Sequence, residues 1–172
     1  FYSITINSVE VDPSDWVGAF NGDICVGAKQ WDTSLCNGEV CDVPVFGDSG
    51  LPETAGYMNQ GDVPTFKIFD GSENSYYWAE AEGEVIKNQG ACVDEAPMCM
   101  EWATNSYYQI PQLQAISGCV DENACDGNNI GTATTDDGSC TFPEENYDCD
   151  GNCINFDCLG VCGGPNVEDE CL

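Results

Sequence analysis

The first part of the chain alternates hydrophobic and polar positions in short runs. In the opening stretch 1–11, Tyr2, Ile4 and Ile6 fall on one side and polar residues lie between them. This two-residue period is typical of a half-buried β-strand, because successive side chains of a strand point to opposite faces. We therefore expect a strand at the start of the chain.

Two β-hairpins are predicted further along. Hydrophobic runs flank Asn21-Gly22, a residue pair that favours the positive φ of a tight turn. In a second pair of runs, Phe66–Phe69 and Tyr76–Ala79, residues 70–74 supply the turn. These patterns predict antiparallel strands joined by short connections.

A last strand is expected near 106–113, where Pro111 marks an edge or a strand end. Since no segment shows a helical period, the predicted fold class is all-β, an antiparallel β-sandwich of Ig-like or jelly-roll-like type. We assign the large aromatic residues first to its core, because they bury the most apolar area: Trp16, Phe20, Trp31, Phe46, Phe66, Phe69, Tyr77, Trp78 and Trp102. The alternative is an outward platform that stacks sugars, with Tyr76, Tyr107 and Tyr108 as its candidates.

The composition changes after Ser117. Aromatic residues become sparse, Gly and Asp increase, and eight of the thirteen cysteines fall in this last part. Such a segment has too few apolar residues for a core of its own, so crosslinks or bound ions must hold it. We predict two domains, a β-sandwich over 1–117 and a small, loop-dominated Cys/Asp-rich module over 118–172.

Charge narrows the range of partners. The chain has 31 Asp plus Glu against three Lys, with no Arg or His, and a formal net charge of −28. Such a surface repels nucleic acid and anionic membranes. No apolar stretch approaches the ~20 residues that cross a bilayer, so we expect no membrane insertion. The repulsion among carboxylates favours bound cations, and Ca²⁺ is the predicted ion.

The cysteines predict disulfides and an oxidising, extracellular location. Cys36 with Cys41, and Cys92 with Cys99, each flank a short loop that a bridge could close. Cys25 is left over, either as a buried thiol or as an intermolecular bridge. The remaining eight are assigned to disulfides whose pairing stays open: Cys119, Cys125, Cys140, Cys149, Cys153, Cys158, Cys162 and Cys171. The C-x3-C spacings also suit zinc or iron–sulfur ligation, but the absence of histidine and the extracellular setting favour disulfides.

Acidic loops of the second module predict calcium sites. Calcium takes six to eight oxygen ligands, and the residues at alternating positions that could supply them are Asp148, Asp150 and Asn152, completed by Asp157 and the Ile154 carbonyl. A second group lies between Cys119 and Cys140: Asp121, Asn123, Asp126, Asp136 and Asp137. A weaker third group is Asn166, Glu168, Asp169 and Glu170. The loops do not match an EF-hand. The alternative is solvated turns, because Asp and Asn are good turn formers.

These motifs carry a resemblance. The phrases "GCVDENACDGNN", "ATTDDGSCTFPEENYDCDGNC" and "CLGVCGGPNVEDEC" resemble the Cys/Asp-rich tandem modules of large secreted bacterial surface proteins and are distantly similar to thrombospondin type 3 calcium repeats. The stretch "ITINSVEVDPSDWVGAFNGDICVGAKQW" resembles the β-sandwich domains that accompany such modules. The resemblance implies a calcium-stiffened extracellular stalk, adhesin or fibre.

A catalytic role has little support. Without histidine, neither Ser/His/Asp nor Cys/His catalysis is available in its usual form, and a glycosidase carboxylate pair is the alternative that the many acids leave open. We therefore expect a non-catalytic extracellular structural protein, a calcium-stabilised, disulfide-stapled subunit of a surface stalk or fibre. It would associate with itself, head to tail, or with adjacent modules, and the opening strand could pair with a neighbour's sheet edge. The alternative is a calcium-dependent carbohydrate-binding or adhesion module with a polysaccharide partner.

Overall fold

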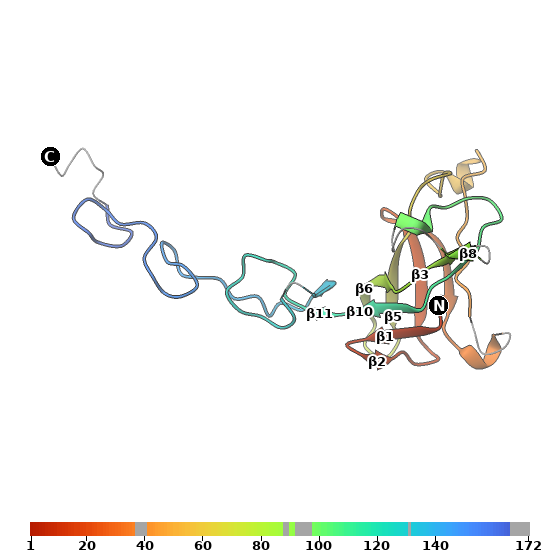
Figure 1. The fold of residues 1–172 in the computed structure, drawn as a ribbon, viewed down its shortest axis with the longest axis horizontal. Helices are drawn as coiled ribbons and strands as arrows, with labels where there is room; N and C mark the ends of the chain where they lie inside the picture. Colours follow the sequence, from red (N-terminus) through yellow and green to blue (C-terminus); the bar gives the residue numbers. More distant parts are fainter. Residues whose placement is uncertain (37–40, 88–89, 92–97, 131, 166–172) are drawn as a thin grey trace. The chain divides into compact units, whose positions relative to one another are not determined.

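The largest element is a seven-stranded mixed β-sheet (Figure 1). It is seen in a computed structural model that describes residues 1–36, 41–87, 90–91, 98–130 and 132–165. The strand order is β2-β1-β10-β6-β5-β3-β4, and two smaller sheets have the orders β8-β7-β9 and β11-β12. The strands are β1 (Ser3–Ile6), β2 (Val9–Glu10), β3 (Trp16–Asn21), β4 (Ile24–Gln30), β5 (Thr65–Asp70), β6 (Ser75–Glu82), β7 (Ile86–Lys87), β8 (Gly90–Ala91), β9 (Tyr108–Gln109), β10 (Gln112–Ala115), β11 (Ser117–Gly118) and β12 (Thr135–Asp136).

The predicted β-rich class is confirmed. The described residues contain no α-helix, and short 3₁₀ turns occur at η1 (Thr33–Leu35), η3 (Pro52–Thr54) and η4 (Met98–Met100). Within the large sheet, neighbouring strands run antiparallel except β1 and β10, which are parallel. The purely antiparallel sheet expected from the sequence is therefore wrong at this one pairing.

Both predicted hairpins are confirmed. In the first, Asn21 of β3 pairs with Ile24 of β4, so the turn consists of Gly22 and Asp23, and Gly22 has φ of +58°. In the second, Asp70 pairs with Ser75, and the Asp70 carboxylate accepts the backbone N–H groups of Ser72 and Glu73. Gly22 and Asp70 thus perform the expected role in their turns, whereas Asn21 ends β3 and the first turn lies one residue later than expected.

The opening strand does not form an edge of the sheet. β1 pairs with β10 on one side, with Ile4 opposite Leu113, and with β2 on the other, with Ile6 opposite Val9. Thr5 and Ile6 are therefore paired on both sides within the chain, and the pairing of β1 with a neighbouring molecule stays a prediction. Local alternation could not reveal the pairing of β1 with β10, because β10 lies more than a hundred residues further along the chain.

The expected last strand is divided by Pro111. β9 belongs to the small β8-β7-β9 sheet and β10 to the large one, and Ile110 and Pro111 separate them. Proline has no N–H to donate to a ladder, so the chain leaves one sheet and joins the other at this point. Ile110 is buried.

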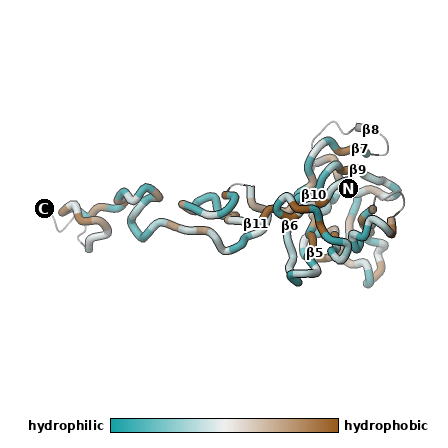
Figure 2. The backbone as a smooth tube through the Cα atoms, turned by 90° about the horizontal axis from the view of Figure 1, so that it is seen from below, coloured by the Kyte–Doolittle hydropathy of each residue, from teal (hydrophilic) through white to brown (hydrophobic). Residues whose placement is uncertain are grey.

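The hydrophobic core covers one face of the large sheet. Its strands contribute residues such as Ile4, Val17, Val26, Ile68 and Leu113, and the connecting segments contribute Met58, Val85 and Met100. Figure 2 shows hydrophobic stretches on β5, β6 and β10 in this domain. Of the aromatic residues assigned to the core, Trp31 and Phe66 are buried, whereas Trp16, Phe46 and Trp78 are 43%, 56% and 40% exposed. For these three the core assignment is wrong.

The chain divides into two compact units, Phe1–Ser117 and Gly118–Leu172. We call them the β-domain and the tail. Among the described residues of the tail, only Gly118 and Cys119 are buried. No helix in the described parts of the chain is long and apolar enough to traverse a lipid bilayer.

Candidate functional site: the disulfide-linked tail

Disulfides connect successive loops of the tail. Cys119 bonds to Cys140, Cys125 to Cys149, and Cys153 to Cys162. The first two bridges interlace, because Cys125 lies inside the loop closed by Cys119 and Cys140. Since so few tail residues are buried, these bonds replace the apolar core that the segment lacks.

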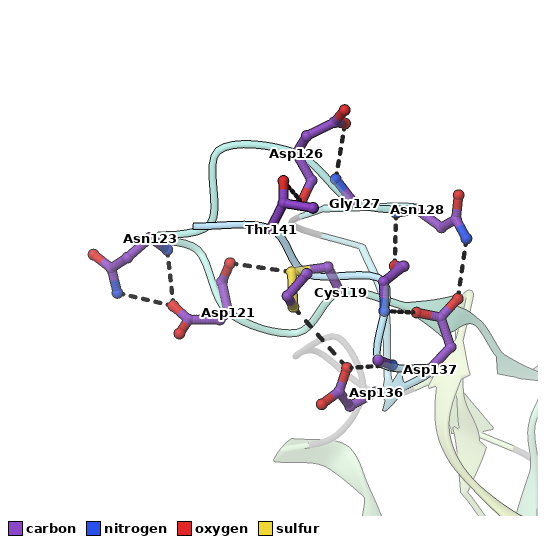
Figure 3. Close-up of a disulfide and its surroundings, with 12 residues drawn as sticks. Cys119, Asp121, Asn123, Asp126, Gly127, Asn128, Asp136, Asp137 and Thr141 are labelled. Atoms are coloured by element: carbon purple, nitrogen blue, oxygen red, sulfur yellow. Dashed lines mark hydrogen bonds between the residues drawn. A yellow bond between two sulfur atoms is a disulfide. The ribbon is translucent and has the colours of Figure 1, made fainter. Parts of the chain in front are cut away.

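The first loop is held by short hydrogen bonds around its bridge (Figure 3). Asp121 turns its carboxylate back to Asn123 and accepts from its backbone N–H at 2.9 Å and its side-chain amide at 3.0 Å. The other arm of the loop approaches through Asp126 and Thr141: the Thr141 hydroxyl donates to the Asp126 carbonyl at 3.1 Å (Figure 3), and the Thr141 N–H donates to the same carbonyl at 2.8 Å. The loop is thus closed by backbone pairing as well as by sulfur.

The remaining acids of this loop also accept local N–H groups. Asp136 accepts from the N–H of Gly138 at 3.0 Å, and Asp137 from the N–H of Ser139 at 2.8 Å (Figure 3). The second Asp137 oxygen accepts from the side-chain amide of Asn128 at 3.1 Å. Each carboxylate therefore stabilises its own turn, as Asp does when it bonds to the backbone two residues further on.

The second half of the tail is a tandem repeat of nine residues. The segments 146–154 (NYDCDGNCI) and 155–163 (NFDCLGVCG) share Asn, an aromatic residue, Asp, Cys, Gly and Cys at equivalent positions. Isolated β-bridges occur at the same place in both, Tyr147 with Cys153 and Phe156 with Cys162. One local structure is therefore built twice.

The backbone N–H groups that donate to the aspartate correspond in the two repeats. In the first, an Asp148 oxygen accepts from the N–H groups of Asp150 and Asn152, at 3.0 and 2.7 Å. In the second, an Asp157 oxygen accepts from Leu159 and Val161 at the same two distances. The glycine between each pair has a positive φ, +77° at Gly151 and +81° at Gly160, where a side chain would be strained.

This repeat is the feature that the sequence-based analysis missed. The signal was the nine-residue spacing of Asn, Asp, Cys and Gly, whereas the expected site combined Asp148, Asp150, Asn152 and Asp157 across both units. In the structure Asp148 and Asp157 each serve a separate loop. Asn152 donates its N–H and its side-chain amide to Asp148, and the Asp150 side chain is exposed.

Hydrogen bonding lowers the pKa of several tail carboxyls. The backbone N–H of Asn123 lowers that of Asp121, and the backbone N–H of Asn152 lowers that of Asp148. For Asp137, the pKa is lowered first by the Ser139 side chain and then by Asn128. In each case the donors favour the ionised form.

The carboxylates do not form a ready-made calcium cage. In the segments that the structure describes, no three His, Cys, Asp or Glu side chains are grouped as metal ligands. Asp148 uses both oxygens as acceptors from Asn152. Three further acids accept N–H groups of their own turns: Asp121, Asp136 and Asp137. Calcium would therefore have to bind carboxylates that already accept N–H groups, and Asn166, Glu168, Asp169 and Glu170 lie outside the described residues.

The other predicted cysteine positions are accounted for in part. Cys36 and Cys41 form a disulfide, and Cys158 is disulfide-bonded. Cys92, expected to pair with Cys99, and Cys171 lie outside the described residues. Cys25 is a free thiol, but it is exposed, so the expectation of a buried thiol is wrong.

Fold and site together define a mostly-β protein with a disulfide-linked, loop-dominated C-terminal region. The four disulfides in which both cysteines are described by the structure indicate an oxidising environment. Comparison of the chain with family models, curated proteins and solved structures found no match.

Proposed function

We propose that the chain is a non-catalytic extracellular structural protein, a subunit of a surface stalk or fibre in which the disulfide-stapled tail acts as a spacer. The observation that carries the proposal is the linkage of successive tail loops by disulfides where almost nothing is buried. A segment held in this way keeps its form without packing against a partner. That property suits a spacer between functional units.

The chemistry of the acids supports a structural role. The best-defined tail carboxylates accept backbone N–H groups, and the chain contains no histidine to act as a general base near neutral pH. The role of Asp148 and Asp157 is therefore to shape loops. For the β-domain, we also propose that its sheets pack as a sandwich.

Calcium stabilisation is the second part of the proposal. It is supported by the net charge of −28 and by the concentration of Asp in the tail, and not by a preformed ligand set. Calcium would supply charge neutralisation among these carboxylates. Because no cage is ready-made, we expect weak affinity, in the ~10⁻⁴–10⁻³ M range of extracellular modules.

The experiment is limited proteolysis and electron microscopy of the full chain in three states: oxidised with millimolar CaCl₂, oxidised with chelator, and reduced. We expect the oxidised tail to resist cleavage in both oxidised states, more strongly with calcium, and the reduced tail to be cut rapidly. Filaments or ordered multimers should form from the oxidised chain.

Each outcome bears on a separate part of the proposal. Equal cleavage with calcium and with chelator would contradict stabilisation of the tail by calcium. A reduced tail as resistant as the oxidised one would contradict its stabilisation by disulfides. An oxidised chain that stays monomeric at every concentration tested would contradict self-association.

A second candidate function is binding of a polysaccharide. It is favoured by an aromatic hollow on the β-domain, which involves neither the tail nor calcium.

A further inference from the structure

The face of the large sheet opposite the core gathers aromatic side chains. Trp16, Phe69 and Tyr76 lie side by side across β3, β5 and β6, as the strand register requires. Tyr76 is 65% exposed, and the Phe69 and Tyr76 rings lie 4.8 Å apart at 44°. Since neighbouring strands are ~4.8 Å apart, this row is about as long as two linked sugar rings.

A hollow of about 480 Å³ opens beside this row. Its lining includes Trp16, Gly18, Phe20 and Tyr76. Gly18 keeps it open, because a Cβ there would come within 2.8 Å of Cε2 of Phe20. The missing side chain leaves room for the Phe20 ring next to Gly18.

Lys67, a cation on this face, already contacts two aromatic rings. Lys67, directly opposite Gly18 and Trp78 in the register, holds its Nζ 4.0 Å from the Trp78 ring centroid and 4.8 Å from that of Phe20. Such cation–π contacts reduce the attraction of an ammonium for external anions. Because the whole chain has a net charge of −28, we expect it to repel acidic ligands.

Polar side chains continue the same face across β6, β10 and β1. Glu80 lies opposite Gln114, which lies opposite Thr5, and Glu82 lies opposite Gln112. The Gln112 amide donates to the Gln114 side-chain oxygen at 2.8 Å. Planar amide and carboxylate groups next to flat rings suit a ligand that has both hydroxyl groups and apolar C–H faces.

We propose that this face of the β-domain binds a neutral polysaccharide of β-linked hexopyranoses. Sugars with equatorial hydroxyls expose flat C–H surfaces that stack on aromatic rings, while their hydroxyls reach outward to amides and carboxylates. The aromatic row holds the sugar faces, and Gln112, Gln114 and Glu80 receive the hydroxyls. Acidic polysaccharides are excluded by charge.

The test is affinity electrophoresis of the full chain through native gels that contain hydroxyethylcellulose, with titration calorimetry of cellohexaose, chitohexaose and mannohexaose. Alginate is the acidic comparison. We expect retardation by hydroxyethylcellulose and none by alginate, and binding of at least one hexaose. Trp16→Ala and Tyr76→Ala should each weaken binding about tenfold or more, as truncation of an aromatic anchor does.

Tyr2→Ala is the matched control, because Tyr2 is a similarly exposed tyrosine, 61%, that lines a different hollow. It should bind like the wild type, and circular dichroism should show all three variants folded. A readout without mutation comes from Cys25, an exposed free thiol that lines the proposed site. Saturating glycan should slow its alkylation by a maleimide, followed at the Cys25 peptide.

The proposal is overturned if none of the neutral glycans binds, if alginate binds as well as they do, or if Tyr2→Ala loses as much affinity as Tyr76→Ala. Unchanged Cys25 alkylation at saturation would also overturn it. So would self-association that Trp16→Ala abolishes without glycan binding, because the face would then be a protein contact. None of these readouts depends on the tail, so they leave the proposed spacer role untouched.

Discussion

Asp148 and Asp157 occupy equivalent positions nine residues apart, and each accepts two backbone N–H groups, from the second and fourth residues that follow it. Each also donates its own N–H to the carbonyl of that fourth residue, at 2.8 Å for Asp148 and 2.9 Å for Asp157. The loop is therefore clamped in both directions by one residue. The local structure therefore depends on the carboxylate oxygen that accepts both N–H groups.

Asp148→Ala should increase amide hydrogen exchange at Asn152 several-fold, because its N–H loses its acceptor. Asp148→Asn is the matched control: it keeps an acceptor oxygen but removes the charge that strengthens the bond, so exchange should rise less than in Asp148→Ala. Exchange that is equally fast in both variants would contradict a role for the acceptor oxygen itself.

Removal of the Cys125–Cys149 bridge should loosen the tail more than removal of Cys153–Cys162. The two close loops with sequence separations of 24 and 9, and the loop-entropy difference is about 0.9 kcal/mol in favour of the longer one. Paired Cys→Ser variants compared by proteolysis rate give the measurement. A more sensitive tail in the Cys153→Ser/Cys162→Ser variant would reverse the order.

Acid should loosen the tail loops. Because the pKa values of Asp121, Asp137 and Asp148 are lowered in the folded chain, their contribution to stability is fully present above the ordinary Asp value of ~3.9. It is lost as the pH falls through the lower folded values. Amide exchange at Asn152 between pH 5 and 2 measures it, and Asp148→Asn should flatten the dependence at that site.

Gly27→Ala should destabilise the β-domain by ~1–3 kcal/mol. A Cβ at Gly27 would lie 1.8 Å from the Pro44 carbonyl oxygen, at the place where the Phe46 N–H donates to Val26 at 2.9 Å. Thermal unfolding measures the change. Ala28→Ser, at the exposed neighbouring position, should leave the midpoint unchanged, and equal midpoints for both variants would contradict the close approach.

The sequence predicted what depends on local chemistry. The Asn21-Gly22 and Asp70–Asn74 turns, and the crowding of cysteines after Ser117, follow from neighbouring residues, and the structure contains both hairpins and the tail disulfides. Strand pairings between residues distant in sequence could not be predicted, since nothing near Ile4 indicates that Leu113 lies beside it. The same limit applies to Cys119 and Cys140.

The aromatic residues show a second limit of prediction from sequence, which concerns the burial of side chains. Trp16 and Trp78 belong to strands in which both faces carry large side chains, so alternation cannot tell which face is covered. Only the strand register and the core residues Val17 and Ala79 assign Trp16 and Trp78 to the opposite face. In the tail, Asp at alternating positions suits both an ion and a turn, and the direction of Asp148 decides between them only in three dimensions.

The interlaced bridges bear on how the chain would respond to tension. From Cys119 to Cys149 the shortest covalent route passes through Cys125 and its bond to Cys149, six residue steps (119 to 125) instead of thirty (119 to 149). An extended chain spans ~3.4 Å per residue. Under tension the route through the disulfide would therefore be fully extended long before the whole chain from 119 to 149 could straighten. Residues 119–149 can therefore lengthen little while these cystines remain oxidised, and a reducing agent would let the intervening chain extend.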